Sequence, residues 1–180
     1  MAGATGEPVG PFPEGADPIE YDKLRRRVLW KMPSGLYVVG SRHGRKRNLM
    51  TLNWATQLSF EPKLVGIGVE REAVTHELIT GGGVFSLCLI DREDRAVVRK
   101  FVKPVEEDET GRLNGFAVFE RRTGAPILEQ SVAWLECEVR HAVETGGHTL
   151  FVGEVVDAAF AKDEETPVLR MEDTRMNYGG

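Results

Sequence analysis

Polar and apolar side chains alternate along residues 48–62, NLMTLNWATQLSFEP. The positions of one parity are mostly apolar: Met50, Leu52, Trp54, Leu58 and Phe60, with Thr56 among them. The positions of the other parity are, apart from Leu49, small or bear amides and hydroxyls: Leu49, Thr51, Asn53, Ala55, Gln57 and Ser59. Because successive side chains of a strand point to opposite faces, the pattern predicts one long β-strand with one apolar face.

The polar face of this predicted strand carries uncharged hydrogen-bonding groups instead of the Lys and Glu of an ordinary solvated face. A row of amides and hydroxyls suits a flat polar ligand with several donors and acceptors. An exposed strand that is rich in Thr, Asn, Gln and Ser has the same pattern. Both interpretations stay open on this stretch alone.

The residues before this strand predict a flexible arm followed by a helix. Residues 1–17 are dense in Gly, Pro and Ala and bury too little apolar area to offset the entropy of ordering. We expect a flexible arm there, able to order against a partner subunit. Asp17-Pro18 then supplies an N-cap and a proline at the first helical position, so a helix is expected from 18 to near Trp30.

Further apolar runs predict short strands and two more helices. The strands are expected at 36–41, 64–69, 84–90, 116–119, 132–141 and 148–159. The last two strands form an antiparallel hairpin around the turn at 144–147, and helices are expected at 73–80 and 91–101. Gly66 and Gly68 share one face of their strand, which fits either a close approach to the backbone or tight packing on a neighbour.

This order of elements predicts a mainly β protein. Many strands at short spacing, with inserted helices, are typical of an antiparallel barrel that carries helices at its rim. We expect three parts: the flexible arm at 1–17, the barrel domain at 18–160 and a C-terminal tail at 161–180.

The composition narrows the class of protein. A hydrophobic fraction of 41% and a charged fraction of 28% are typical of a soluble globular protein, and a net charge of -5 argues against a nucleic-acid binder. The sequence has no apolar run long enough for a membrane helix and no apolar signal-peptide core. Cys88 and Cys137 lie in apolar runs, as buried thiols do. We therefore expect a cytoplasmic protein.

Motifs for catalysis by protein groups alone are missing from the sequence. It contains no GxGxxG between a strand and a helix, no Walker A sequence, no GxSxG and no HExxH. The four histidines are scattered, and no Cys/His cluster has the spacing of metal ligands, so no metal site is expected. If the protein is an enzyme, a cofactor therefore carries the chemical step.

Two basic features have open interpretations. Arg71 and Thr75 lie at the start of the helix predicted at 73–80, where unpaired N–H groups favour an anion, although capping residues give the same pattern. The hexapeptide RHGRKR at 42–47 is either a solvated hairpin tip or a site that attracts the phosphates of a nucleotide.

Four segments, in this order, resemble the flavin reductase-like family, the FMN-binding split barrels. They are PSGLYVVGS from Pro33, TLNWATQLSFEP from Thr51, GGVFSLCL from Gly82, and the pair AWLECEV from Ala133 and GHTLFVGEV from Gly147. The pair is the most specific, being similar to the family's A-x-L-E-C-x-V and G-H-x-L-x-x-G-x-V runs. The resemblance covers residues 28 to 160.

The resemblance implies an antiparallel, Greek-key split β-barrel with FMN along the central strand. It places the isoalloxazine edge at Thr51, Leu52, Asn53 and Ala55, and the ribityl chain and phosphate at Thr56, Gln57 and Ser59. It adds Arg71, Thr75 and His76 as phosphate contacts, and Phe101, Val102 and Lys103 as residues that approach the flavin. His148 corresponds to the family's histidine beside the stacked nicotinamide and flavin, as an orienting or proton-supplying group or as a structural one.

The activity implied by this resemblance is NAD(P)H:flavin oxidoreduction, with NADH or NADPH as co-substrate. It also implies a homodimer with flavin sites at the interface, and a partner monooxygenase that receives the reduced flavin. Three residues depart from the family: Trp54 and Thr56 stand where Ser is frequent, and Cys88 stands where Asn is usual. Two alternatives remain open, a protein of this fold that holds FMN, a deazaflavin or haem without rapid turnover, and a barrel without a ligand.

Overall fold

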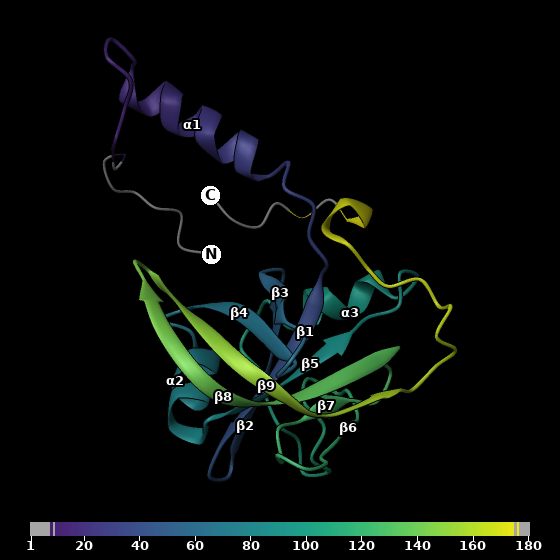
Figure 1. Ribbon diagram of the computed structural model, residues 1–180. Coiled ribbons are helices and arrows are strands. Elements are labelled where there is room, and N and C mark those ends of the chain that lie inside the picture. The colour runs from purple at the N-terminus through teal and green to yellow at the C-terminus, as the bar shows by residue number, and fades with distance from the viewer. Residues whose placement is uncertain (1–7, 9, 175, 177–180) are drawn as a thin grey trace. The chain divides into compact units, whose positions relative to one another are not determined.

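The computed structural model describes residue 8, residues 10–174 and residue 176, which form two compact units (Figure 1). One unit contains α1 (Pro18–Leu29), and its predicted start is confirmed, because the Asp17 carboxylate accepts the Glu20 N–H at 2.9 Å. None of the α1 residues is buried. The predicted arm at 1–17 lies partly outside the described residues.

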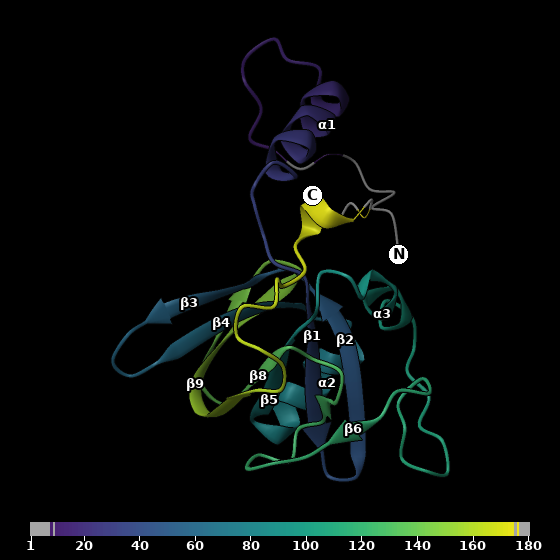
Figure 2. The same cartoon turned by 90° about the vertical axis from the view of Figure 1, so that its right-hand side faces the viewer.

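The other unit, Ser34–Thr174, is built on a seven-stranded antiparallel sheet. Its strands, in the order β2-β1-β5-β8-β9-β4-β3, are β1 (Tyr37–His43), β2 (Lys46–Leu52), β3 (Ala55–Ser59), β4 (Leu64–Glu70), β5 (Val84–Leu89), β8 (Ala133–Thr145) and β9 (His148–Phe160). Figure 2 shows the β1–β2 pair and the β3–β4 hairpin, which extends to one side. The mainly β, antiparallel prediction is confirmed.

Three short helices and a second, two-stranded sheet complete this unit. They are α2 (Val74–Gly82), α3 (Arg95–Lys100), the 3-10 helix η1 (Met171–Asp173), β6 (Val118–Phe119) and β7 (Ile127–Leu128). α2 packs against β1 and β2, and it ends at Gly83 in the left-handed conformation, φ 68°. In the part of the chain that the structure describes, no helix is both long and apolar enough to cross a membrane.

The single strand predicted over residues 48–62 is wrong, because the chain breaks it at Asn53-Trp54 into β2 and β3. These two strands form opposite edges of the seven-stranded sheet. The break also inverts the alternation: Leu52 and Ala55, which have opposite parity, both pack on the same hydrophobic core. Consequently the predicted apolar face continues outward on β3, where Leu58 is 46% exposed.

The core lies on one face of the sheet and a second buried layer on the other. Phe85, Ile67 and Phe151 belong to the core, with α2 covering part of it through Ile79. Burial raises the pKa of the Cys137 thiol in this core to about 12, and that of Cys88 to about 12, which confirms both as buried free thiols.

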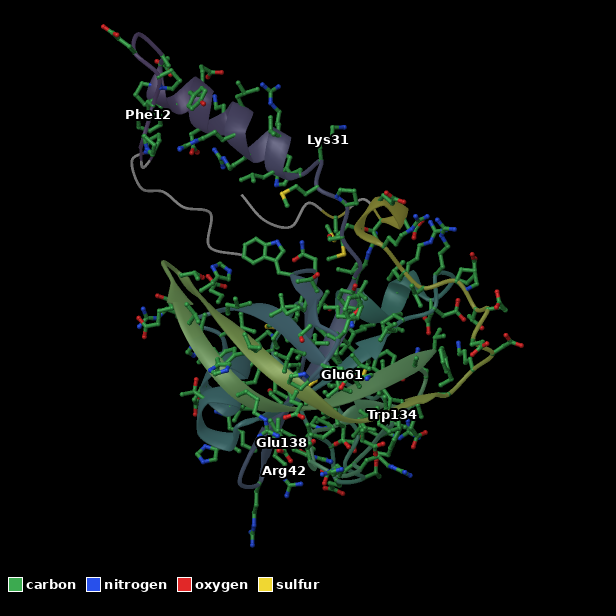
Figure 3. All side chains as sticks on the ribbon, in the orientation of Figure 1. Phe12, Lys31, Arg42, Glu61, Trp134 and Glu138 are labelled. Atoms are coloured by element: carbon green, nitrogen blue, oxygen red, sulfur yellow. The ribbon has the colours of Figure 1, made fainter. Side chains whose placement is uncertain are left out.

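The second layer contains a buried carboxylate that the sequence did not reveal. Glu136 is fully buried and accepts the Arg122 and Thr123 N–H groups at 2.7 and 3.0 Å, together with the Thr123 hydroxyl. It thereby fixes the turn at 122–123 to β8. Trp134, two residues earlier on the same face of β8, is also buried, against Phe119 (Figure 3).

The segment that follows β9 packs back on this unit. Leu169 is buried, its carbonyl accepts the Leu36 N–H at 3.1 Å, and its own N–H donates to the Ile90 carbonyl at 2.7 Å. The part of the predicted tail before residue 175 therefore contributes to the structure.

Candidate flavin and nucleotide site

The break between β2 and β3 leaves a buried polar side chain, that of Asn53, which the sheet does not use. Asn53 is 7% exposed, and its side-chain amide makes no hydrogen bond to any residue that the structure describes. Its carbonyl accepts the Ala55 N–H at 3.1 Å, and the Trp54 carbonyl accepts the Gly68 N–H at 2.9 Å. The backbone is thus fixed on both sides of an amide that keeps its donors and its acceptor.

The polar residues of β3 are open to solvent at least in part. Thr56 and Gln57 are exposed, Ser59 and Ala55 are half-buried, and the hydrogen bonds of the polar side chains are long. The Thr56 hydroxyl lies 3.4 Å from the Gln57 carbonyl, and the Gln57 amide nitrogen lies 3.3 Å from the Ser59 carbonyl. Such weak local contacts leave these groups able to bind a ligand.

Thr51 lies in a different environment from the one predicted. It is buried, its hydroxyl donates to the Val98 carbonyl of α3, and its N–H donates to the Phe101 carbonyl at 3.0 Å. Leu52 is buried in the core. The structure therefore brings the end of β2 beside Phe101, but it engages the Thr51 groups within the protein.

Residues 101–103 lead from this contact to the surface. Phe101 is buried and packs against Phe116, with ring centroids 5.3 Å apart. Val102 and Lys103, which follow, are exposed. The resemblance implied that these three residues approach the flavin, and the Thr51–Phe101 hydrogen bond holds the first of them beside the end of β2.

The start of α2 has unpaired backbone donors. Ala73, the N-cap residue, supplies no side-chain cap. The N–H groups of Val74 and Thr75 find no acceptor among the described residues, and Arg71 lies nearby with an exposed guanidinium, 3.1 Å from the Glu144 carboxylate. Free N–H groups at a helix N-terminus attract anions.

The side chains of Thr75 and His76 are directed into the protein. Thr75 is buried, and its hydroxyl accepts from the Asn48 amide at 2.8 Å. The His76 Nε2 lies 2.8 Å from the Thr149 hydroxyl, and the ring packs on Phe151. Burial, and then the Arg71 charge, lower the pKa of His76, so its imidazole is held neutral.

His148 lies at the start of β9, beside Trp54. The two ring centroids are 4.6 Å apart, and the ring planes are inclined at 52°. Since successive residues of a strand point to opposite faces, the side chains of His148 and Thr149 lie on opposite sides of β9. The structure therefore groups His148 with Trp54 and places His76 on the other side of the strand.

The basic hairpin tip is largely used within the protein. Arg42, near the end of β1 (Figure 3), pairs with Glu120 at 2.7 Å, and Arg47 pairs with Glu107 and Glu120. Lys46 lies 3.3 Å from the Glu77 carboxylate. These ion pairs favour the interpretation of residues 42–47 as a solvated tip that holds neighbouring loops.

Three residues of this region were not predicted. Asn48 and Thr149 hold Thr75 and His76, and Trp54 contacts His148. The sequence placed Trp54 on an inward apolar face, because the break that turns it outward has no proline or glycine to mark it.

Comparison with known proteins identifies the family. Residues 29–179 match the flavin reductase like domain. The NADH-dependent FAD reductase of Streptomyces globisporus is 33% identical over 153 residues, which are 83% of this chain and 82% of that protein.

Solved structures agree. A Streptomyces globisporus C-1027 NADH:FAD oxidoreductase in complex with NAD and FAD fragments superposes with a TM-score of 0.72 at 30% identity, covering 86% of this chain and 90% of the other. The styrene monooxygenase flavin reductase from Pseudomonas putida S12 superposes with a TM-score of 0.66 at 27% identity, covering 76% and 87%. The chain therefore belongs to the flavin reductase-like family and is an oxidoreductase of the flavin reductase type.

Proposed function

We propose that this protein binds FMN where β2 gives way to β3 and transfers a hydride to the flavin from NAD(P)H. The observation that carries the proposal is the Asn53 amide, which is fixed at the break and makes no hydrogen bond to any described residue. A bound flavin supplies the chemistry of accepting a hydride and passing on its electrons. The residues of the chain supply binding, orientation and electrostatic stabilisation.

The ring edge is proposed to lie at Asn53 and Ala55, with Thr56, Gln57 and Ser59 along the ribityl chain. The amide of Asn53 can donate to a ring carbonyl and accept from a ring N–H, which fixes the ring in its plane. Donors placed where negative charge develops on the ring also stabilise it. Thr51 and Leu52 would act here mainly through the buried structure that supports this edge.

The phosphate is proposed to lie at the start of α2. The N–H groups of Val74 and Thr75 and the Arg71 guanidinium offer a partial positive charge and direct donors. His76 stays neutral and fixes the first turn of α2 through Thr149. Arg71 would exchange its exposed partner Glu144 for the phosphate, and an exposed ion pair of this kind is weak.

The nicotinamide is proposed to approach beside His148, with Phe101, Val102 and Lys103 closing the opposite side. His148 would orient the nucleotide through ring nitrogens that have no partner among the described residues. Alignment of the two reacting rings is the main contribution of the protein to the rate.

The choice of FMN is the finer part of this proposal, since the most similar proteins named above use FAD. Both flavins share the ring, the ribityl chain and the first phosphate, and the donors at α2 suit that phosphate. NADPH differs from NADH by a 2′-phosphate. Lys46 and Arg47 already form ion pairs with Glu77 and Glu120, which does not favour binding of that phosphate by these two residues.

Three further properties belong to the proposal. A split barrel is supported by β2 and β3, opposite edges of the sheet that are joined by the short link Asn53-Trp54. A homodimer is supported by Leu58 and Phe60, which are exposed on and just after β3. A partner monooxygenase is supported by the similarity to the reductase of styrene monooxygenase.

Steady oxidation of NADH and NADPH, followed at 340 nm with excess FMN or FAD, tests this function. Continuous oxidation of either nucleotide is expected. A protein that binds flavin but reduces it only once would be a carrier instead, and a protein without affinity for either flavin would contradict the proposal.

A further inference from the structure

Trp54 is held over the backbone of β4 in an unusual position. Its carbonyl accepts the Gly68 N–H at 2.9 Å, and its indole lies on Gly68, where an added Cβ would be 3.2 Å from the ring atom Cε3. Since Gly68 has no side chain, the ring can lie directly on the strand. Even so, Trp54 is 43% exposed. Part of the ring is therefore covered by β4, and the rest faces solvent.

His148 has Trp54 as its aromatic neighbour and makes no side-chain hydrogen bond to a described residue. The ring nitrogens of His148 have no hydrogen-bond partner among the described residues, while its backbone carbonyl accepts from the Thr145 hydroxyl at 3.3 Å. The hairpin tip before it, residues 141–147, is exposed. The indole, 4.6 Å away, is the aromatic neighbour that limits the rotation of the imidazole.

The two rings together have a shape that suits a flat ligand. Their planes meet at 52°, so they form a wedge whose walls are an indole surface and an imidazole with available nitrogens. Planar heterocycles stack well on exposed indole surfaces. The wedge lies directly after Asn53, whose unpaired amide was assigned above to the ring edge of the flavin.

We propose that Trp54 and His148 form an aromatic seat for a planar heterocycle, either flavin or nicotinamide, and that Trp54 orients His148 toward it. This inference deepens the proposed function and rests on it, because the seated ring is one of the two between which the hydride passes. The seat belongs to this chain in particular, since a small residue at position 54 would leave His148 without its aromatic neighbour.

Tryptophan fluorescence tests the seat by binding alone. Wild type and Trp54→Phe are titrated separately with FMN, FAD and NAD+, and nucleotide is also added after flavin. A ring that stacks on Trp54 quenches its emission, and this part of the quenching disappears in Trp54→Phe. Quenching by flavin alone assigns the seat to flavin, and quenching by NAD+ assigns it to nicotinamide. Equal quenching in both proteins with every ligand would overturn the proposal.

Trp30 provides a matched control. It is also 43% exposed, but it is the C-cap residue of α1 and does not belong to the unit Ser34–Thr174. Trp30→Phe is expected to keep the ligand-dependent quenching of the wild type. Trp54→Ala is expected to weaken the affinity for the seated ring roughly tenfold, the usual cost of losing one stacking partner. Trp54→Phe, which keeps a ring, is expected to recover most of that affinity.

A double-mutant cycle tests the orientation of His148. The rate of flavin reduction, at concentrations of nucleotide and flavin that saturate each variant, is measured for Trp54→Ala, His148→Ala and the double variant, with the melting temperature of each. If Trp54 acts through His148, the double variant is about as slow as His148→Ala alone. Independent, multiplicative losses would contradict the orienting role. Absence of turnover in the wild type would refute the proposed function instead, while the quenching experiment would still decide on the seat.

Discussion

β2 and β3 derive from one alternating stretch of sequence, yet the fold buries one and exposes the other. Leu52 of β2 lies in the core and Thr51 is bonded to α3, so both faces of that strand are covered. On β3, Leu58 is 46% exposed and Gln57 faces solvent. Alternation therefore identifies an extended segment, but the segments that pack around it decide which faces are covered.

The two strands also differ in what they contribute to the proposed site. β2 is a rigid support, because its hydroxyl and amide groups are satisfied within the protein and its apolar groups are buried. β3 instead leaves amides and hydroxyls exposed, and we propose that a ligand binds to them. The unpaired amide of Asn53 lies where one environment changes into the other.

The largest expected contrast is between Leu52→Ala and Leu58→Ala. Leu52 is 5% exposed and its truncation leaves a cavity in the core, so the free energy of unfolding should fall by about 2–5 kcal/mol. Leu58 is half-exposed, and its truncation should cost about 1 kcal/mol or less. Urea unfolding of both variants measures this. Equal losses would show that the two strands are not differently buried.

A smaller contrast is expected between Thr51→Val and Thr56→Val. The first removes a buried hydroxyl that donates to the Val98 carbonyl and should cost about 1 kcal/mol of unfolding free energy. The second removes an exposed hydroxyl with a 3.4 Å contact and should change stability by about 0.5 kcal/mol at most. Thermal unfolding of both variants measures the difference. A larger loss of stability in Thr56→Val than in Thr51→Val would contradict the claim that the Thr51 hydroxyl is bonded within the protein and the Thr56 hydroxyl is not.

The dependence of stability on pH should follow the buried side of the site. Because the folded state lowers the pKa of His76, the unfolded chain binds its proton more tightly. The free energy of unfolding should therefore decrease as the pH falls through about 6.5 to the folded pKa, and this group should contribute no further loss below it.

His76→Gln should flatten that part of the pH profile relative to the wild type. Denaturant unfolding between pH 5 and pH 8 makes the comparison. An unaltered slope in His76→Gln would show that His76 titrates alike in both states.

Much of the fold follows from local patterns. The Asp17-Pro18 start of α1, the Gly-rich end of α2 and the β8–β9 hairpin at Gly146-Gly147 all have strong sequence signals, and the structure contains each of them. The break at Asn53-Trp54 has no such signal, because both residues fit the alternation on either side. It depends on β3 pairing with β4 at the far edge of the sheet.

The glycines of β4 and the residues of the site also show that the sequence alone does not reveal which segments pack together. Gly66 and Gly68 do make room on one face, but the neighbours that fill it are Leu58 and Trp54 of the same chain, which is the tight-packing interpretation. The resemblance singled out Asn53, Arg71 and His148, which stay predicted site residues. It did not foresee that Thr51 and Thr75 would be bonded inside the protein, since those bonds come from α3 and Asn48, distant in sequence.

The affinity of Asn53→Leu for FMN tests the central claim most directly. Leucine has nearly the shape of asparagine, so the backbone at the break should persist while the hydrogen bonds to the ring are lost. We predict an affinity about tenfold weaker than that of the wild type, with an unchanged melting temperature. A folded Asn53→Leu protein that binds FMN as tightly as the wild type would contradict the placement of the flavin at the junction of β2 and β3.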